Sequence, residues 1–146
     1  MKSKRKMIWL LLMIGVMIVI FCLSNQPSEV SSKISDTVAE GMNIQQENTS
    51  TSLSATKVAF GLNIRKLAHI GLFALLGITA RGYTTEAFRA LAICFGYAVF
   101  DETHQFFVEG RTGSVKDVAI DAIGFLLVIF VWEIIAIIMR NRKKKA

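Results

Sequence analysis

Four predominantly apolar stretches alternate with polar segments along the chain. They cover residues 7–23, 64–81, 87–108 and 117–139. The first contains no charged residue, and the last is interrupted after Asp117 only by Asp121 and Glu133. A helix needs about 20 apolar residues to cross a bilayer core of about 30 Å. The pattern therefore predicts an all-α fold: an integral membrane bundle of four transmembrane helices, in a single domain that covers residues 1–146.

The composition agrees with a membrane protein and excludes other classes. Of the 146 residues, 53% are hydrophobic and 19% are charged. Low hydrophobicity is the condition for disorder, so a disordered chain is excluded. A soluble domain of this length rarely tolerates so apolar a composition. Cys22 and Cys94 lie inside apolar stretches and match neither a disulfide framework nor a zinc motif.

The distribution of the net charge of +6 predicts the topology. Nine of the 17 basic residues lie in two tails, residues 2–6 and 140–145, which hold no acidic residue. Short flanks rich in lysine and arginine stay on the cytoplasmic side of a membrane. Both termini are therefore expected to be cytoplasmic, which requires an even number of spans. Basic residues that flank apolar segments indicate a lipid bilayer as partner and no nucleic acid.

Residues 24–63 form the predicted first outer loop and are rich in Ser, Thr, Asn and Gln. Within this loop, apolar residues recur every four positions and predict a short amphipathic helix at the membrane interface. They are Val30, Ile34, Val38 and Met42, with Ser28 available as the N-cap. Because no small-x-small cleavage pattern follows Leu23, we interpret residues 7–23 as an uncleaved anchor rather than a signal peptide.

This topology brings most ionisable residues near the membrane to the outer ends of the last three helices. The candidate site residues there are Arg65, Lys66, His69, Asp101, Glu102, His104, Gln105, Arg111, Ser114, Asp117 and Asp121. Charges inside a bilayer cost about 2.5–3.5 kcal/mol each, so they usually face one another or water. We therefore predict a polar pocket between these helices that opens outward.

Helical spacing places several of these residues on shared faces, because residues four apart lie one above the other. The pairs are Arg65 with His69, Asp101 with Gln105, and Asp117 with Asp121. Gly124 lies on the same helix face as Asp117 and Asp121, and a glycine there lets a neighbouring helix approach closely. The expected walls are Arg65 or Lys66 opposite Asp101 or Glu102, and Arg111 near Asp117.

One function that fits the predicted pocket is binding without catalysis. The pocket would bind a lipid-linked or anionic envelope component, or a protein partner. Arg65 and Arg111 would hold a phosphate or carboxylate through two parallel hydrogen bonds. Carboxylates such as Asp117 would orient these arginines.

A second function, an envelope enzyme, fits the same residues, and the sequence does not choose between the two. Asp101, Glu102 and His104 would perform acid–base chemistry on a lipid-linked or cell-wall substrate, assisted by His69. The spacing matches no zinc signature such as H-E-x-x-H, so we predict no metal and no cofactor. A proton-coupled transporter fits less well, because a proton path needs ionisable residues across the whole membrane. Toward the inner end there is only Glu133, which we interpret as a contact between helices.

Several short motifs in the chain occur together in one known family. They are Ser24-Asn25-Gln26-Pro27, Arg65-Lys66-Leu67-Ala68-His69, Asp101-Glu102-Thr103-His104-Gln105-Phe106, Gly110-Arg111-Thr112-Gly113-Ser114 and Lys116-Asp117-Val118. With these motifs, most of residues 8–140 resembles the VanZ-like family of bacterial membrane proteins. The resemblance implies a four-helix protein of the bacterial plasma membrane, linked to low-level resistance to glycopeptides such as teicoplanin. The motifs are also the residues that the predicted topology places at the outer face.

Overall fold

The structure is a computed structural model, and it describes the backbone of residues 2–26, 53–108 and 114–145. Side chains are described over the same ranges except at residues 2, 53–65 and 144–145. Within these ranges the chain forms four α-helices and no strand. The helices are α1 (Lys2–Ser24), α3 (Leu53–Tyr83), α4 (Ala87–Gln105) and α5 (Val115–Lys145). The predicted all-α fold is therefore confirmed for the described part of the chain.

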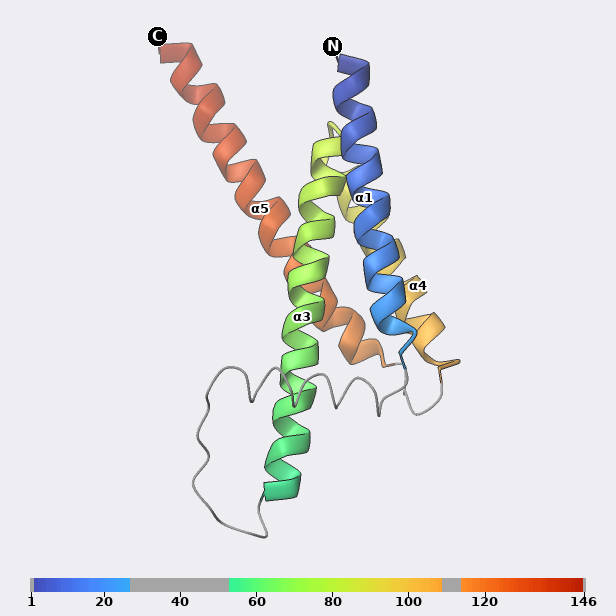
Figure 1. Ribbon diagram of the computed structural model, residues 1–146. Helices are drawn as coiled ribbons and strands as arrows, with labels where there is room; N and C mark the ends of the chain where they lie inside the picture. The colour runs from blue at the N-terminus through green and yellow to red at the C-terminus, as the bar shows by residue number, and fades with distance from the viewer. Residues whose placement is uncertain (1, 27–52, 109–113, 146) are drawn as a thin grey trace.

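Both ends of the chain lie at the same end of the helix bundle (Figure 1). α1 runs beside α3, a short connection turns the chain into α4, and α5 crosses α3 on its way back to the first end (Figure 1). The end of α1, the end of α4 and the start of α5 gather at the opposite end (Figure 1). The positions of the termini agree with the even number of helices that the basic tails predict.

Apolar side chains from all four helices fill the space between them. Ile20 of α1, Phe73 and Leu76 of α3, Cys94 of α4 and Phe125 of α5 are all fully or almost fully buried. The ring centres of Phe73 and Phe125 are 6.5 Å apart, in a tilted arrangement that aromatic pairs favour. This core holds α3 against α5 and so places the polar side chains at one end of the bundle.

Gly124 marks a very close approach of α5 to α3. A Cβ atom built at Gly124 would collide with the backbone carbonyl oxygen of Ile70 and would lie 3.0 Å from the backbone nitrogen of Ala74. At Gly77 of α3, a Cβ atom would lie 3.1 Å from the Cα atom of Phe125. Glycines on both helices thus let the two backbones pack directly. The close helix approach predicted at Gly124 is confirmed.

Two of the described helices are long and apolar enough to cross a membrane, over Ser3–Ser24 and Val115–Lys143. Only 17% of the most apolar window of the first helix, and 22% of that of the second, is buried inside the bundle. Large side chains such as Leu11 and Phe130 point outward and are 63% and 68% exposed. The core helix of a soluble protein would be mostly buried, so these outer faces fit a hydrocarbon environment.

Three helices, α1, α3 and α5, extend beyond the apolar stretches that predicted them. α3 begins at Leu53, so residues 53–63 of the predicted outer loop are helical, and α5 continues to Lys145. The reason is that hydropathy marks the part of a helix that fits a bilayer, not the residue at which the helix ends. α4 instead ends at Gln105, because residues 106–108 turn and donate their backbone N–H groups to its last carbonyl oxygens.

An ion pair joins α3 to α5 toward the end of the bundle that holds the termini. Arg81 Nη2 lies 2.6 Å from Glu133 Oε1, and Arg81 Nε donates a hydrogen bond to the same oxygen at 2.7 Å. The guanidinium group also lies 5.8 Å from the ring centre of Trp132, within cation–π range. These contacts confirm the interpretation of Glu133 as a helix–helix contact.

Candidate functional site

Asp101 lies at the centre of a polar cluster at the end of the bundle opposite the termini. Its side chain is fully buried. Asp101 Oδ2 accepts hydrogen bonds from Ser24 Oγ of α1 at 2.9 Å and from Gln105 Nε2 at 2.8 Å. Gln105 reaches this oxygen because it lies one turn further along the same face of α4. A buried carboxylate is costly unless it accepts hydrogen bonds, so these two donors stabilise and orient Asp101.

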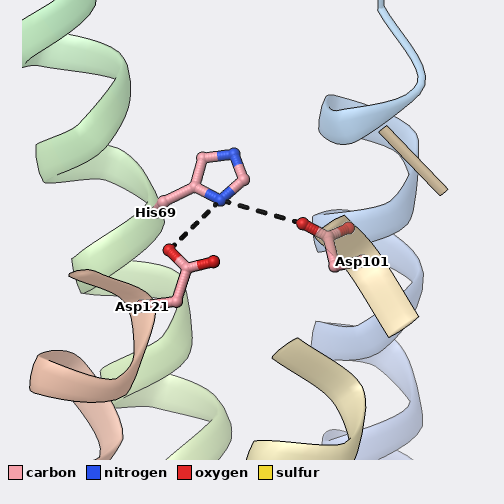
Figure 2. Close-up of side chains that lie close together, drawn as sticks. All are labelled: His69, Asp101 and Asp121. Atoms are coloured by element: carbon pink, nitrogen blue, oxygen red, sulfur yellow. Dashed lines mark ion pairs between the residues drawn. The ribbon is translucent and has the colours of Figure 1, made fainter. Parts of the chain in front are cut away.

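His69 of α3 lies between Asp101 of α4 and Asp121 of α5 (Figure 2). His69 Nδ1 is 3.6 Å from Asp121 Oδ1 and 4.0 Å from Asp101 Oδ2. Asp121 is also buried, with 2% of the residue exposed. The structure therefore brings together three of the candidate residues from three different helices.

Glu102 and Ser114 attach the start of α5 to the end of α4. The backbone N–H of Ser114 donates a hydrogen bond to Glu102 Oε2 at 2.8 Å. Ser114 Oγ in turn accepts a hydrogen bond from the backbone N–H of Lys116 at 3.2 Å, which makes Ser114 the N-cap of α5. A carboxylate beside a helix N-terminus is also favoured by the helix dipole. The contacts of these two candidate residues thus hold the start of α5 beside the end of α4.

A small pocket opens beside His69. It is lined by Lys66, His69, Glu102, Gln105, Asp117, Ile120 and Asp121. Lys66 Nζ lies 3.1 Å from Asp117 Oδ1, and the two side chains are 41% and 31% exposed. Lys66 of α3 and Glu102 of α4 both line this pocket, and the ion-pair partner of Lys66 is Asp117 of α5. The described lining contains more carboxylates than basic groups.

His104, a candidate catalytic residue, lies against α1 and is not among the residues that line the pocket. Its ring stacks on that of Phe21, with the ring centres 4.5 Å apart. His104 Nε2 lies within hydrogen-bond distance of Asn25 Oδ1, at 3.2 Å. The structure therefore brings His69 and Asp101 together but does not place His104 with them. The four catalytic candidates do not form one described cluster.

The side chains of the two arginines predicted to hold an anion are not among those that the structure describes. Arg65 is placed on α3, one turn before His69, but its side chain is not among those described. Arg111 lies outside the described residues, and so does the predicted amphipathic helix with Ser28 as its N-cap. The predicted contact of Arg111 with Asp117 stays a prediction.

Ser24 and Asn25 belong to the polar cluster but are missing from the predicted site. Ser24 is fully buried and donates to Asp101, while Asn25 contacts His104. Spacing along a helix could not find them, because they follow the apolar stretch of α1 and share no face with the other candidates. The signal that could have found them is the Ser24-Asn25-Gln26-Pro27 motif at the end of that stretch.

Outward-facing apolar helices together with buried ionisable side chains at one end of the bundle are the arrangement of a helical membrane protein. The chain belongs to the VanZ/LLP1 family, whose family model matches residues 9–136. This match confirms the resemblance to the VanZ-like family that the sequence motifs indicate. No curated protein and no solved structure matches the chain.

Proposed function

We propose that this protein crosses the bacterial plasma membrane four times, with both termini in the cytoplasm, and that its polar pocket faces outward. The pocket then binds the polar headgroup of a lipid-linked envelope component. The observation that carries this proposal is the pocket beside His69, at the end of the bundle opposite the basic termini. Ionisable groups are costly in a bilayer and are retained mainly where they serve a function.

The described lining supports a headgroup that offers both an anionic group and hydrogen-bond donors. The ammonium group of Lys66 is part of the lining and is only partly enclosed, so a phosphate can share it with Asp117. Glu102 and Asp117 supply acceptors for hydroxyl or amine groups. A lipid-linked sugar phosphate combines these features. Arg65 and Arg111 are proposed as further phosphate ligands.

Family membership adds a cellular consequence to this proposal. The VanZ-like resemblance implies a link to low-level teicoplanin resistance, and an antibiotic that acts on envelope precursors is met at the outer face. We therefore propose that headgroup binding at the pocket contributes to glycopeptide resistance. The lining groups that carry this proposal, Lys66, Glu102 and Asp117, can hold a headgroup through ion pairs and hydrogen bonds, so binding is the proposed activity.

The proposed topology predicts a definite pattern for reporter fusions. Alkaline phosphatase, which is active only outside the cytoplasm, should be active when fused after residue 50 or 112 and inactive after residue 85 or 146. A fluorescent protein that matures only in the cytoplasm should give the opposite pattern at the same four positions. Phosphatase activity at residue 146 would contradict cytoplasmic termini and, with them, the outward-facing pocket.

Headgroup binding predicts that Lys66→Gln weakens retention of an anionic lipid. A charge-assisted hydrogen bond is worth about 1.5–3 kcal/mol, so we expect binding of a polyprenyl phosphate to weaken at least about tenfold. Native mass spectrometry of the purified protein in detergent measures the retained lipid.

Lys116→Gln is the matched control for this experiment. Lys116 is exposed at the same end of the bundle and is not among the residues that line the pocket. The Lys116→Gln variant should therefore bind the phosphate lipid as the wild type does. Uncharged polyprenol should bind weakly to the wild type and to both lysine variants. Equal losses in the two lysine variants, or equal retention of the alcohol and the phosphate, would count against the pocket.

A further inference from the structure

His69, Asp101 and Asp121 form a compact cluster of side chains that can ligate a metal (Figure 2). One ligand atom from each residue lies within 4.8 Å of the other two. We propose that this cluster binds one divalent transition-metal cation, for which Zn²⁺ is a suitable probe. The inference goes beyond the headgroup bound in the pocket and does not depend on it, because metal binding is measured without lipid.

The distances around His69 fit metal coordination better than hydrogen bonding. Nδ1 lies 3.6 Å from Asp121 Oδ1 and 4.0 Å from Asp101 Oδ2. Hydrogen bonds between N–H and O usually span about 2.7–3.2 Å, so neither contact is one. Two ligand atoms of a tetrahedral zinc ion, with bonds of about 2.0–2.1 Å, are about 3.4 Å apart. Small inward shifts of the three side chains would complete that geometry.

Two carboxylate oxygens in the cluster are buried without a hydrogen-bond partner. They are Asp101 Oδ1 and Asp121 Oδ2. Figure 2 shows the second oxygen of Asp121 pointing into the space between the two aspartates. Buried polar atoms nearly always have a partner, and a buried charge without one is strongly destabilising. A cation bound between the three side chains would provide the missing interaction for Asp121 Oδ2, since a carboxylate can coordinate a metal through either oxygen or both.

The surroundings of the cluster resemble those of protein metal sites, where ligands are held by further hydrogen bonds. Ser24 and Gln105 donate to Asp101 and leave some of the lone pairs of its carboxylate available. The ring of His69 stacks near that of Phe73, with the centres 6.3 Å apart. Asp101 and His69 are thus oriented by side chains from α1, α3 and α4.

The adjoining pocket has room for the remaining coordination position. It includes His69 and Asp121 in its lining and has a cavity volume of about 20 Å³. A water molecule needs at least about 10–15 Å³ of such volume together with polar neighbours. One water can therefore complete a four-coordinate site with one nitrogen and two oxygen ligands from the protein.

The ligand set favours a transition metal over magnesium or calcium. Imidazole suits Zn²⁺, Fe²⁺ and similar ions, whereas Mg²⁺ and Ca²⁺ prefer oxygen ligands alone. The combination of His69 with Asp101 and Asp121 therefore predicts a preference for transition metals such as Zn²⁺ over Mg²⁺ and Ca²⁺. These ligands come from positions 69, 101 and 121, so they form no local sequence motif. This explains why the sequence alone predicts no metal here.

Zinc titration of the full-length protein tests the proposal. The protein is purified in detergent without an affinity tag, carries Cys22→Ser to remove the exposed thiol, and is stripped with EDTA. Calorimetry and elemental analysis after dialysis are expected to give one Zn²⁺ per chain, with about 100-fold weaker binding of Mg²⁺. The near-isosteric changes Asp121→Asn and His69→Gln are expected to weaken zinc binding at least about 100-fold.

The matched control is His104→Gln, since His104 contacts α1 and not the cluster. It should bind zinc as the parent protein does. Zinc binding by folded Asp121→Asn and His69→Gln at the parent affinity would overturn the proposal, as would a parent protein that binds no zinc. X-ray absorption of the zinc-loaded parent provides a test that does not depend on the folding of the variants. A shell of nitrogen and oxygen is expected, and sulfur ligation would also overturn the site.

Discussion

Replacing Gly124 with alanine is expected to lower the free energy of unfolding by about 3 kcal/mol or more, at or beyond the upper end of overpacking effects. The added methyl group would collide with the carbonyl oxygen of Ile70, which belongs to the backbone and cannot turn away as a side chain can. α5 would have to move away from α3 along the crossing. Thermal unfolding in detergent, followed by circular dichroism, measures the change.

Gly96→Ala is the matched control, because a Cβ atom at Gly96 of α4 would have no neighbour within 4 Å. Alanine is a better helix former than glycine by about 0.8–1.0 kcal/mol, so this variant should be as stable as the wild type or slightly more stable. The two substitutions add the same atom but should have effects of opposite sign. Equal stability of Gly124→Ala and the wild type would show that the backbones are not in direct contact.

Phe73→Ala is expected to cost about 3 kcal/mol, the lower end of the range for removing a buried phenylalanine. In a membrane protein, a phenylalanine that leaves the core of the bundle meets lipid or detergent instead of water. The substitution therefore removes mainly packing interactions, and the lower end of the range applies. Phe73 is fully buried, and its ring lies 6.3 Å from those of His69 and Tyr97. The variant would leave a cavity directly beside the metal-ligand cluster.

Phe88→Ala removes the same atoms from a side chain that is 79% exposed. Its cost should stay within about 0.5 kcal/mol, as for surface substitutions in general. Unfolding of both variants in the same detergent separates the loss of packing from a general effect of shortening a phenylalanine. Similar destabilisation at positions 73 and 88 would argue against a core centred on Phe73.

The helices and the end of the bundle at which the polar residues gather could be predicted from the sequence. Apolar length identified four helices, and the basic tails implied that both termini lie at one end. Spacing by four residues placed Asp101 and Gln105 on one face, where Gln105 indeed donates to Asp101. These features follow from the geometry of single helices, which the sequence encodes locally.

The choice of partners between helices could not be predicted in the same way. Spacing gives the face of one helix but not its rotation against the next helix. The ion pair of Lys66 with Asp117 and the stacking of His104 on Phe21 of α1 therefore could not be predicted. The packing of large core side chains such as Phe73 and Phe125 decides these rotations. The helix ends were also missed, because hydropathy does not determine where helices stop.

The glycine crossing has a mechanical consequence for the polar cluster. Gly124 lies less than one turn from Asp121, and Ile70 directly follows His69, so the point of backbone contact is adjacent to both side chains. A contact between two backbones acts as a pivot: when α5 tilts about it, distant parts sweep through a wide arc while nearby parts barely move. The Arg81–Glu133 ion pair, which joins the arm of α5 beyond Gly124 to α3, limits such a tilt further. The spacing between His69 and Asp121 therefore stays nearly constant.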